Sequence, residues 1–585
     1  MARQDHRPSS QTPSTPKSSR ATLPKDGGTD SAHLAPFSLW EYLKEEVLAT
    51  DVDSTQEMRW DRVSNFMAVP WQCEKMILFG FVICLDSFLY TFTILPLRFA
   101  VAATLWCRNL LHNVTRPSAT PHVSLHSSHK CDIIKTALIV VSCYILSQVT
   151  DASKMYHSVR GQDTIKLYVI FNVLEIVDRL CCSLGQDLLD ALFSRRTLGR
   201  QSDGRQPLIR PLHLFVLALI YIQIHTIVLF YQLVTLNVAI NSYDNALLTL
   251  LLSNQFVEIK GSVFKKFEKE NLFQMTCADI VERFQLTLIL FAIGVRNLIE
   301  VTSGGDNLSS VASRPRGGPL GDVPLPRSFT VLPSLSVLAT SFAPVVIVLG
   351  SECVVDWLKH AFITKFNHIR PSVYGRFMDV LCRDLVIAGP AQNTFVDQSP
   401  ILSRRLGFAA LPLACLLARV LVQIYGMLGD DSHYDECAIP SSAGQTSSGA
   451  YDYVVALMRN VLRGKISALS FSPSTSLQAL ALLLPVILCW VFLVALKVLL
   501  GTALISFAHH RYSTMSAREV EEELNDRTRP HIGVNSLEAA YEDKVKQVLS
   551  GADGAKASGR PKNGPGTGSN LLDVNRYTMV KSRLY

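Results

Sequence analysis

Charged residues inside long apolar stretches are the part of this sequence most able to do chemistry. Asp86 lies about ten residues into the apolar stretch that begins at Met76. An ionised carboxylate there costs several kcal/mol unless it is paired or wetted. We interpret it either as part of a polar pathway for an ion or substrate, or as half of a structural ion pair, and we favour the pair. The basic residues that could face it are Arg98, Arg296, Arg419 and Lys497.

Motifs of catalytic and nucleotide-binding sites are missing from the chain. It has no GxSxG, HExxH, Walker A or GxGxxG sequence. His213 and His225 lie in one apolar stretch, about three helical turns apart, and could face the same side. For both we favour a core or interfacial role over metal ligation. The sequence therefore predicts no enzyme activity, no cofactor and no metal.

Aromatic and basic residues gather in two further segments. Large aromatics beside basic residues suit a membrane interface and also suit a protein partner. We predict that an amphipathic helix over about 254–283 and a helix pair over about 352–385, whose second helix starts near Pro371, form one cytosolic platform. The candidate platform residues are Phe256, Lys260, Phe264, Lys265, Lys266, Phe267, Trp357, Phe362 and Phe366.

The apolar segments that position these residues are long. Several approach or exceed the roughly 20 residues needed to cross a bilayer. Ile165–Leu180 is a weaker candidate because it contains charged residues. The fold class is therefore an all-α polytopic membrane protein, with about 7–8 transmembrane helices and basic amphipathic interfacial helices. The stronger candidates are Met76–Trp106, Ile133–Val149, Leu212–Ile240, Phe284–Leu298, Phe329–Gly350, Leu406–Leu428 and Leu477–Phe507.

Loop charges predict part of the topology. The acidic loop 429–476 is expected to be luminal, whereas the basic loop 351–405 and the tail after His509 are expected to be cytosolic. Glycosylation sequons stand at Asn113 and Asn307, in short loops that could be luminal.

Eight crossings satisfy all of these placements but put the Arg-containing loop 194–205 in the lumen. Seven crossings keep that loop in the cytosol but put the two tails on opposite sides. A re-entrant segment over Leu212–Ile240 is a third arrangement. These counts stay open at the level of the sequence.

Composition divides the chain further. Residues 1–36 are polar and rich in Ser, Thr and Pro, which predicts a disordered tail. We expect an amphipathic pre-membrane segment over 37–75, a transmembrane core over 76–508 and a mostly flexible cytosolic tail over 509–585.

The net charge of +7 favours ordinary positive-inside bias, with contact to anionic lipid as the alternative. Basic residues are not arranged in a recognisable nucleic-acid-binding fold, so we expect a lipid bilayer and no nucleic acid among the partners.

Three long blocks resemble the transmembrane anterior posterior transformation protein family, which includes fungal endoplasmic-reticulum membrane relatives. They begin DIIKTALIVV, TLNVAINSYD and DWLKHAFITK and cover 132–193, 235–286 and 356–385. The likeness extends over roughly Leu39 to Asp384 and more loosely over the last spans.

The resemblance implies a multi-pass endoplasmic-reticulum membrane protein without known catalysis. It also implies a complex with a SUN-like-domain membrane protein that protects newly made proteins from degradation. We therefore expect a non-enzymatic scaffold in protein folding and quality control. The alternative is a transporter or channel that uses buried charges such as Asp86.

Overall fold

The first apolar segment is part of a much longer helix. In the computed structural model, α2 runs over Asp53–Thr115 and contains Pro70 and Pro96. The second half of the expected pre-membrane segment is therefore continuous with the first expected span. Asn113 lies in the last turn of this helix instead of in a loop.

The structure describes residues 39–40, 43, 47, 53–115, 125–150, 152–199, 209–241, 246–303, 335–367, 369–387, 405–429 and 473–528. The chain divides into two units, Met1–Glu57 and Met58–Tyr585. In the first unit, the described positions before Asp53 are helical and exposed. The expected tail over 1–36, residues 430–472 of the expected luminal loop 429–476, residues 529–585 and the sequon at Asn307 lie outside the described residues.

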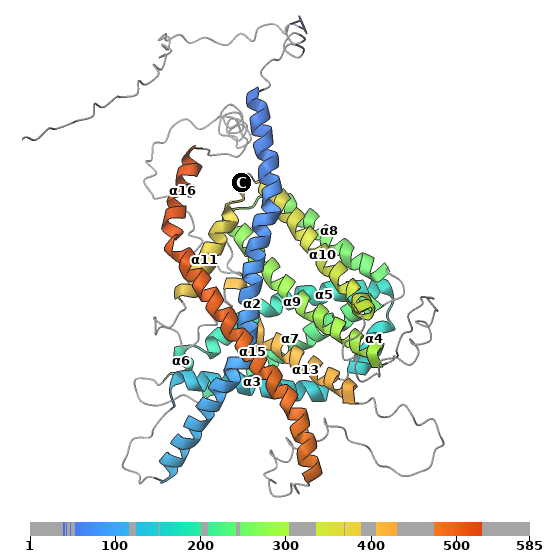
Figure 1. Cartoon of the computed structure of the whole chain (residues 1–585), viewed down its shortest axis with the longest axis vertical. Coiled ribbons are helices and arrows are strands. Elements are labelled where there is room, and N and C mark those ends of the chain that lie inside the picture. The colour runs from blue at the N-terminus through green and yellow to red at the C-terminus, as the bar shows by residue number, and fades with distance from the viewer. Residues whose placement is uncertain are drawn as a thin grey trace, which may run out of the picture. The chain divides into compact units, whose positions relative to one another are not determined.

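The described part of the second unit is built from helices and contains no strand, so the all-α expectation is confirmed (Figure 1). The helices after α2 are α3 (Ser127–Val149), α4 (Ala152–Arg160), α5 (Thr164–Leu192), α6 (Arg195–Leu198), α7 (Ile209–Asn241), α8 (Ala246–Val263), α9 (Lys269–Ser303), α10 (Leu335–Phe366), α11 (Val373–Ile387), α13 (Ala410–Gly429), α15 (Pro473–Ser513) and α16 (Met515–Thr528).

Membrane-length helices support the polytopic assignment. Among the described residues, five helices are long and apolar enough to cross a bilayer, and Ala410–Ile424 is a shorter apolar helix. The expected segments Ile165–Leu180 and Phe284–Leu298 fall in α5 and α9, which carry several charged residues and are not among the five. The five are Arg62–His112, Ser127–Val149, Ile209–Asn241, Ser341–Phe366 and Val486–Ser513.

The amphipathic segments differ from the expected helices in their boundaries. The helix expected over 254–283 is divided, because α8 ends at Val263 and α9 begins at Lys269. The Asn367 side-chain oxygen, at the end of α10, accepts a hydrogen bond of 2.8 Å from the Phe267 backbone N–H in this turn. A partner 100 residues away in the chain thus helps to hold the turn. α9 and α10 each join part of an expected platform helix to part of an expected membrane span.

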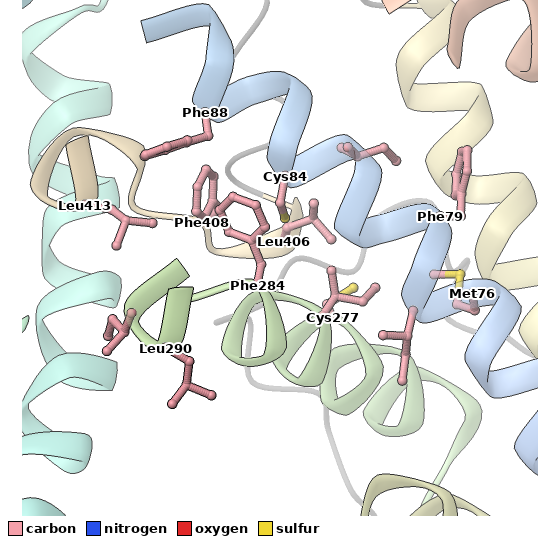
Figure 2. Close-up of a cluster of buried hydrophobic side chains, with 14 of the residues drawn as sticks. Met76, Phe79, Cys84, Phe88, Cys277, Phe284, Leu290, Leu406, Phe408 and Leu413 are labelled. Carbon is pink, nitrogen blue, oxygen red and sulfur yellow. The ribbon is translucent and has the colours of Figure 1, made fainter. Parts of the chain in front are cut away.

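Aromatic packing between α2 and α9 forms the centre of the main apolar core (Figure 2). The Phe284 ring lies 5.2 Å from Phe81, 5.8 Å from Phe88 and 5.3 Å from Phe408, measured between ring centroids. Offset and edge-on pairs of this kind each contribute about 0.5–1.5 kcal/mol beyond the area they bury. Gly80 permits the close approach of the two helices, since a Cβ there would lie 2.4 Å from the Ile280 side chain.

α11 is tied to the last two helices by one carboxylate. The Asp379 side chain accepts from Arg511 at 2.6 Å and from Arg518 at 2.8 Å. Arg511 lies at the end of α15 and Arg518 lies in α16, so the region expected to start a flexible tail at 509 begins with described helix. α5 packs along α7, and α13 packs against α7 and α3 (Figure 1).

Candidate functional site

Asp86, the carboxylate singled out by the sequence, forms an ion pair with Lys497. The pair joins α2 to α15, and its two side chains are 23% and 14% exposed. Neighbouring contacts join the same helices, including a hydrogen bond of 3.1 Å from Trp490 Nε1 to the Phe92 carbonyl. Asp86 is thus a paired charge between two helices of membrane length.

The other three basic residues contact different groups. Arg98 donates to Asp132 at 3.1 Å and to Ser128 at 3.0 Å, which connects α2 to α3. Arg419 donates to the carbonyl of Thr150 at 2.9 Å, just beyond the end of α3. Arg296 lies over the Tyr156 ring, 5.7 Å from its centroid. Apart from the pair of Asp86 with Lys497, the structure does not bring this set together.

The candidate platform residues meet in part. The Phe264 ring, just after α8, lies 5.8 Å from the Phe366 ring at the end of α10. Phe366 also stacks on Phe362 at 6.2 Å, and Phe362 contacts Phe66 of α2 at 5.3 Å. Beside these rings is a cavity of about 240 Å³ lined by Arg62, Asn65, Phe66, Val69, Thr364, Lys365, Phe366 and Ile369.

The candidate platform residues differ in how exposed their side chains are. Phe264 is 78% exposed and Phe256 is 58% exposed. Lys260, Lys265 and Lys266 are exposed as well. Trp357 is different, because its indole N–H donates to Glu74 at 2.8 Å and so faces inward.

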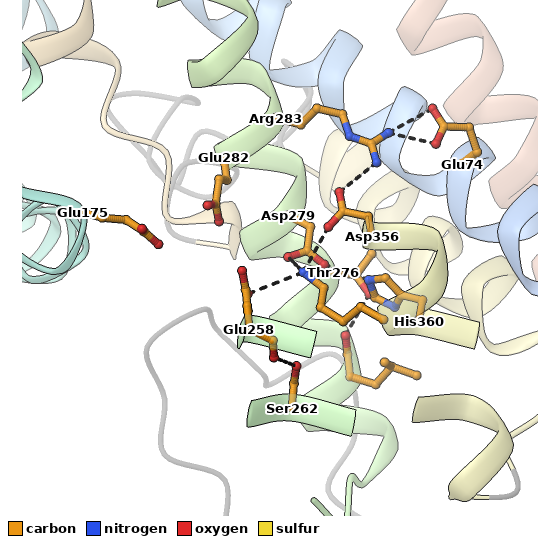
Figure 3. Close-up of polar contacts among 12 residues, drawn as sticks. Glu74, Glu175, Glu258, Ser262, Thr276, Asp279, Glu282, Arg283, Asp356 and His360 are labelled. Atoms are coloured by element: carbon orange, nitrogen blue, oxygen red, sulfur yellow. Dashed lines mark hydrogen bonds and ion pairs between the residues drawn. The ribbon is translucent and has the colours of Figure 1, made fainter. Parts of the chain in front are cut away.

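A buried ion cluster, which the sequence reasoning missed, lies between α2, α9 and α10 (Figure 3). We define it as Glu74, Asp279, Arg283, Asp356, Lys359 and His360. Arg283 binds Glu74 and Asp356, each at 2.8 Å. Lys359 binds Asp279 at 2.8 Å and Asp356 at 3.0 Å.

His360 completes the ion cluster and connects it to α11. Its Nε2 lies 2.7 Å from Asp279 Oδ2, and its Nδ1 lies 2.9 Å from the Tyr374 hydroxyl. The side chains of Asp356, Lys359 and His360 are 0–2% exposed. With so little solvent, each charge depends on its partners, and removing one partner of such a pair typically costs about 3–5 kcal/mol.

Electrostatics favour the ionised form of Asp279. Burial by itself would raise the pKa of this carboxyl. The Lys359 ammonium and the hydrogen bond from His360 outweigh burial and hold the pKa well below its usual range. The arrangement therefore stabilises a fixed charge and holds four helices in register.

The signal for this ion cluster was present in the sequence. Asp356, Lys359 and His360 stand three and four residues apart, and Asp279 and Arg283 stand four apart. On a helix this spacing puts the charges of each segment on one face. What the spacing does not reveal is that the two charged faces lie against each other.

One group in the described part of the chain has the composition of a metal site. Asp178, Cys182 and His225 have ligand atoms within 4.8 Å of one another. The first two come from α5 and the third from α7.

Comparisons with known proteins agree with this architecture. Residues 125–513 match the model of a eukaryotic membrane protein family. Endoplasmic reticulum membrane protein 65 of Schizosaccharomyces pombe is 38% identical, over 94% of this chain and 81% of the relative. No solved structure matches the chain.

Animal relatives cover less of the chain. The Transmembrane anterior posterior transformation protein 1 homolog of Xenopus laevis is 38% identical over 69% of this chain and 69% of the relative. The human homolog is 40% identical over 63% of this chain and 58% of the relative. The chain therefore belongs to this eukaryotic membrane protein family, that of the transmembrane anterior posterior transformation proteins, and is a multi-pass protein of the endoplasmic reticulum membrane.

Proposed function

We propose that this protein is a non-enzymatic scaffold of the endoplasmic reticulum membrane. It acts in a complex with a SUN-like-domain membrane protein that supports folding or protects newly made proteins from degradation. Family resemblance suggests the partner and the role. The observation that carries the scaffold assignment is the buried ion cluster, because its charges are used to bind one another.

A scaffold needs a rigid support and a surface that can bind a partner. The cluster joins α2, α9 and α10 and reaches α11 through Tyr374. Phe256 in α8, Phe264 just after α8 and Phe366 at the end of α10 leave large aromatic areas exposed. Exposed aromatics on a rigid support are typical anchors of a protein interface. We place this platform on the cytosolic face, where Lys260, Lys265 and Lys266 also suit contact with anionic lipid.

The scaffold proposal is tested by purifying the tagged protein in mild detergent and identifying its bound proteins by mass spectrometry. We expect a stoichiometric SUN-like-domain membrane protein with the wild type. The double variant Phe264→Ala, Phe366→Ala should lose at least one stoichiometric partner, because it removes the exposed rings but not the ion cluster. Phe492→Ala is the matched control, since it removes an exposed ring from α15. Recovery of the wild type alone would contradict the scaffold role, and unchanged partners in the double variant would contradict the platform.

A second candidate function is transport, and the pair of Asp86 with Lys497 favours it. This pair lies between two membrane-length helices and keeps some exposure. In that case, the protein in liposomes should conduct an ion or move a lipid, and Asp86→Asn should reduce the rate at least tenfold. If wild-type liposomes show no flux, or if Asp86→Asn leaves the flux unchanged, this pathway is wrong. If the pair is only structural, Asp86→Asn should lower the melting temperature in detergent.

A further inference from the structure

Three potential ligand atoms converge where α5 lies along α7. Asp178 Oδ1 is 2.6 Å from His225 Nε2. Cys182 Sγ is 3.9 Å from both of these atoms. A carboxylate oxygen, a thiol sulfur and an imidazole nitrogen thus face one small volume.

Neighbouring groups orient two of these side chains. The Tyr221 hydroxyl lies 3.0 Å from His225 Nδ1, and Gln285 of α9 donates to Asp178 Oδ2 at 3.1 Å. His225 is 1% exposed and Cys182 is 9% exposed. A hydroxyl on the far nitrogen of a histidine and an amide on the far oxygen of a carboxylate are typical outer-shell contacts of metal ligands.

Gly185 makes the position of Tyr221 possible. A Cβ at Gly185 would lie 1.9 Å from the Tyr221 hydroxyl oxygen and ring. Only a residue without a side chain lets α5 approach this closely, one turn after Cys182. The Tyr221 side chain, which orients His225, is thus held at the contact between α5 and α7.

A cavity of about 100 Å³ lies next to this point. Cys182, Gly185 and Tyr221 line it, together with polar groups that include Lys135, Gln186 and Asp190. Apolar side chains make up most of the rest of its lining, and a cavity of that size with some polar groups has room for more than one water molecule. Water there could complete a set of three protein ligands.

We propose that Asp178, Cys182 and His225 form a binding site for a divalent transition metal, with zinc as the best fit. Calcium and magnesium prefer oxygen ligands only, whereas a mixed nitrogen, sulfur and oxygen set suits zinc. Zinc–ligand bonds of about 2.0–2.3 Å in tetrahedral geometry put ligand atoms about 3.3–3.7 Å apart. The separations of 3.9 Å from the sulfur are near this range, and the contact of 2.6 Å between His225 and Asp178 opens by less than about 1 Å.

Proton positions follow from this assignment. His225 binds the metal through Nε2 as a neutral imidazole and carries its proton on Nδ1, where it donates to Tyr221. Cys182 binds as a thiolate and its thiol proton leaves to solvent. Ionisation of the Cys182 thiol thus releases one proton for each metal ion bound.

The test uses the purified full-length protein in detergent, stripped with a chelator and titrated with Co²⁺ as a spectroscopic probe. We expect one Co²⁺ per chain, with the strong visible bands of a four-coordinate site and a sulfur-to-cobalt charge-transfer band. Added Zn²⁺ should abolish both sets of bands. Cys182→Ser should remove the charge-transfer band, whereas Cys181→Ser, at the adjacent position of α5, should retain it.

Two further variants separate binding from folding. His225→Gln should weaken Co²⁺ binding at least tenfold, whereas His213→Gln, an exposed histidine of α7, should not change it. Tyr221→Phe keeps the ring and should weaken binding about 10–100-fold through loss of orientation.

The proposal is overturned if the wild type binds no Co²⁺, or if Cys182→Ser, eluting as a folded species, keeps the charge-transfer band. If Cys182→Ser does not fold, unchanged affinity in Tyr221→Phe overturns the proposed orientation of His225. The site is independent of the scaffold role, so failure of either leaves the other intact.

Discussion

At the scale of single residues, the charges of the ion cluster are shared between several partners. Arg283 divides its guanidinium between Glu74 and Asp356, and Lys359 bridges Asp279 and Asp356. Replacing a whole buried ion pair by apolar residues is often tolerated, whereas removing one partner leaves an isolated charge. Single substitutions in the ion cluster should therefore be severe.

Asp279→Asn is the sharpest of these substitutions. It leaves Lys359 with less opposing charge and should lower the free energy of unfolding by about 3–5 kcal/mol. The measurement is thermal unfolding in detergent. Glu519→Gln, an exposed position in α16, is the control and should change stability by less than about 0.5 kcal/mol. Equal melting temperatures for Asp279→Asn and the wild type would show that the ion cluster does not hold the helices together.

The lowered pKa of Asp279 predicts that the stability of the protein depends on pH. Its pKa is lower in the folded protein than in the unfolded chain. Its stabilising contribution is therefore fully present above the ordinary carboxyl pKa and is lost as the pH falls through the folded value. As the pH falls below about 4, the wild type should lose more stability than Asp279→Asn. Parallel curves for the two proteins would contradict this assignment.

At the scale of elements, glycine positions report where helices touch. A Cβ at Gly80 would lie 2.4 Å from Ile280, whereas at Gly350 nothing lies within 4 Å. Gly80→Ala should destabilise the contact of α2 with α9 by about 1–3 kcal/mol. Gly350→Ala, also inside a helix, should stabilise by about 0.5–1 kcal/mol. Thermal unfolding of the two variants checks this, and stabilisation by both would mean that α2 and α9 are not in close contact.

At the scale of the whole second unit, α16 is attached through α11. Asp379 is the shared acceptor of Arg511 and Arg518. Asp379→Asn should loosen α16 and its attachment to the end of α15, because it removes the charge that Arg511 and Arg518 share. Limited proteolysis should then cut within 515–528 several-fold faster than in the wild type, while Glu519→Gln is cut at the wild-type rate. Equal rates for Asp379→Asn and the wild type would show that Asp379 does not hold α16.

The sequence by itself determined the class of the protein and the position of its apolar helices. Long apolar stretches report their own tendency to form buried helices, since the signal is local and needs no partner. Segments such as Leu212–Ile240 and Leu477–Phe507 thus reappear within α7 and α15. Three long blocks were enough to identify the family, and the comparisons confirm it.

Which charged and polar side chains bind one another was decided only by the tertiary structure. Asp86 had several equally plausible basic partners in the sequence, and only packing of α2 against α15 selects Lys497. The ion cluster and the site of Asp178, Cys182 and His225 were missed for the same reason. Bonded partners in the ion cluster lie as far as 209 positions apart, as Glu74 and Arg283 do. Helical spacing reports which residues share a face, but which faces meet depends on the packing of the whole bundle.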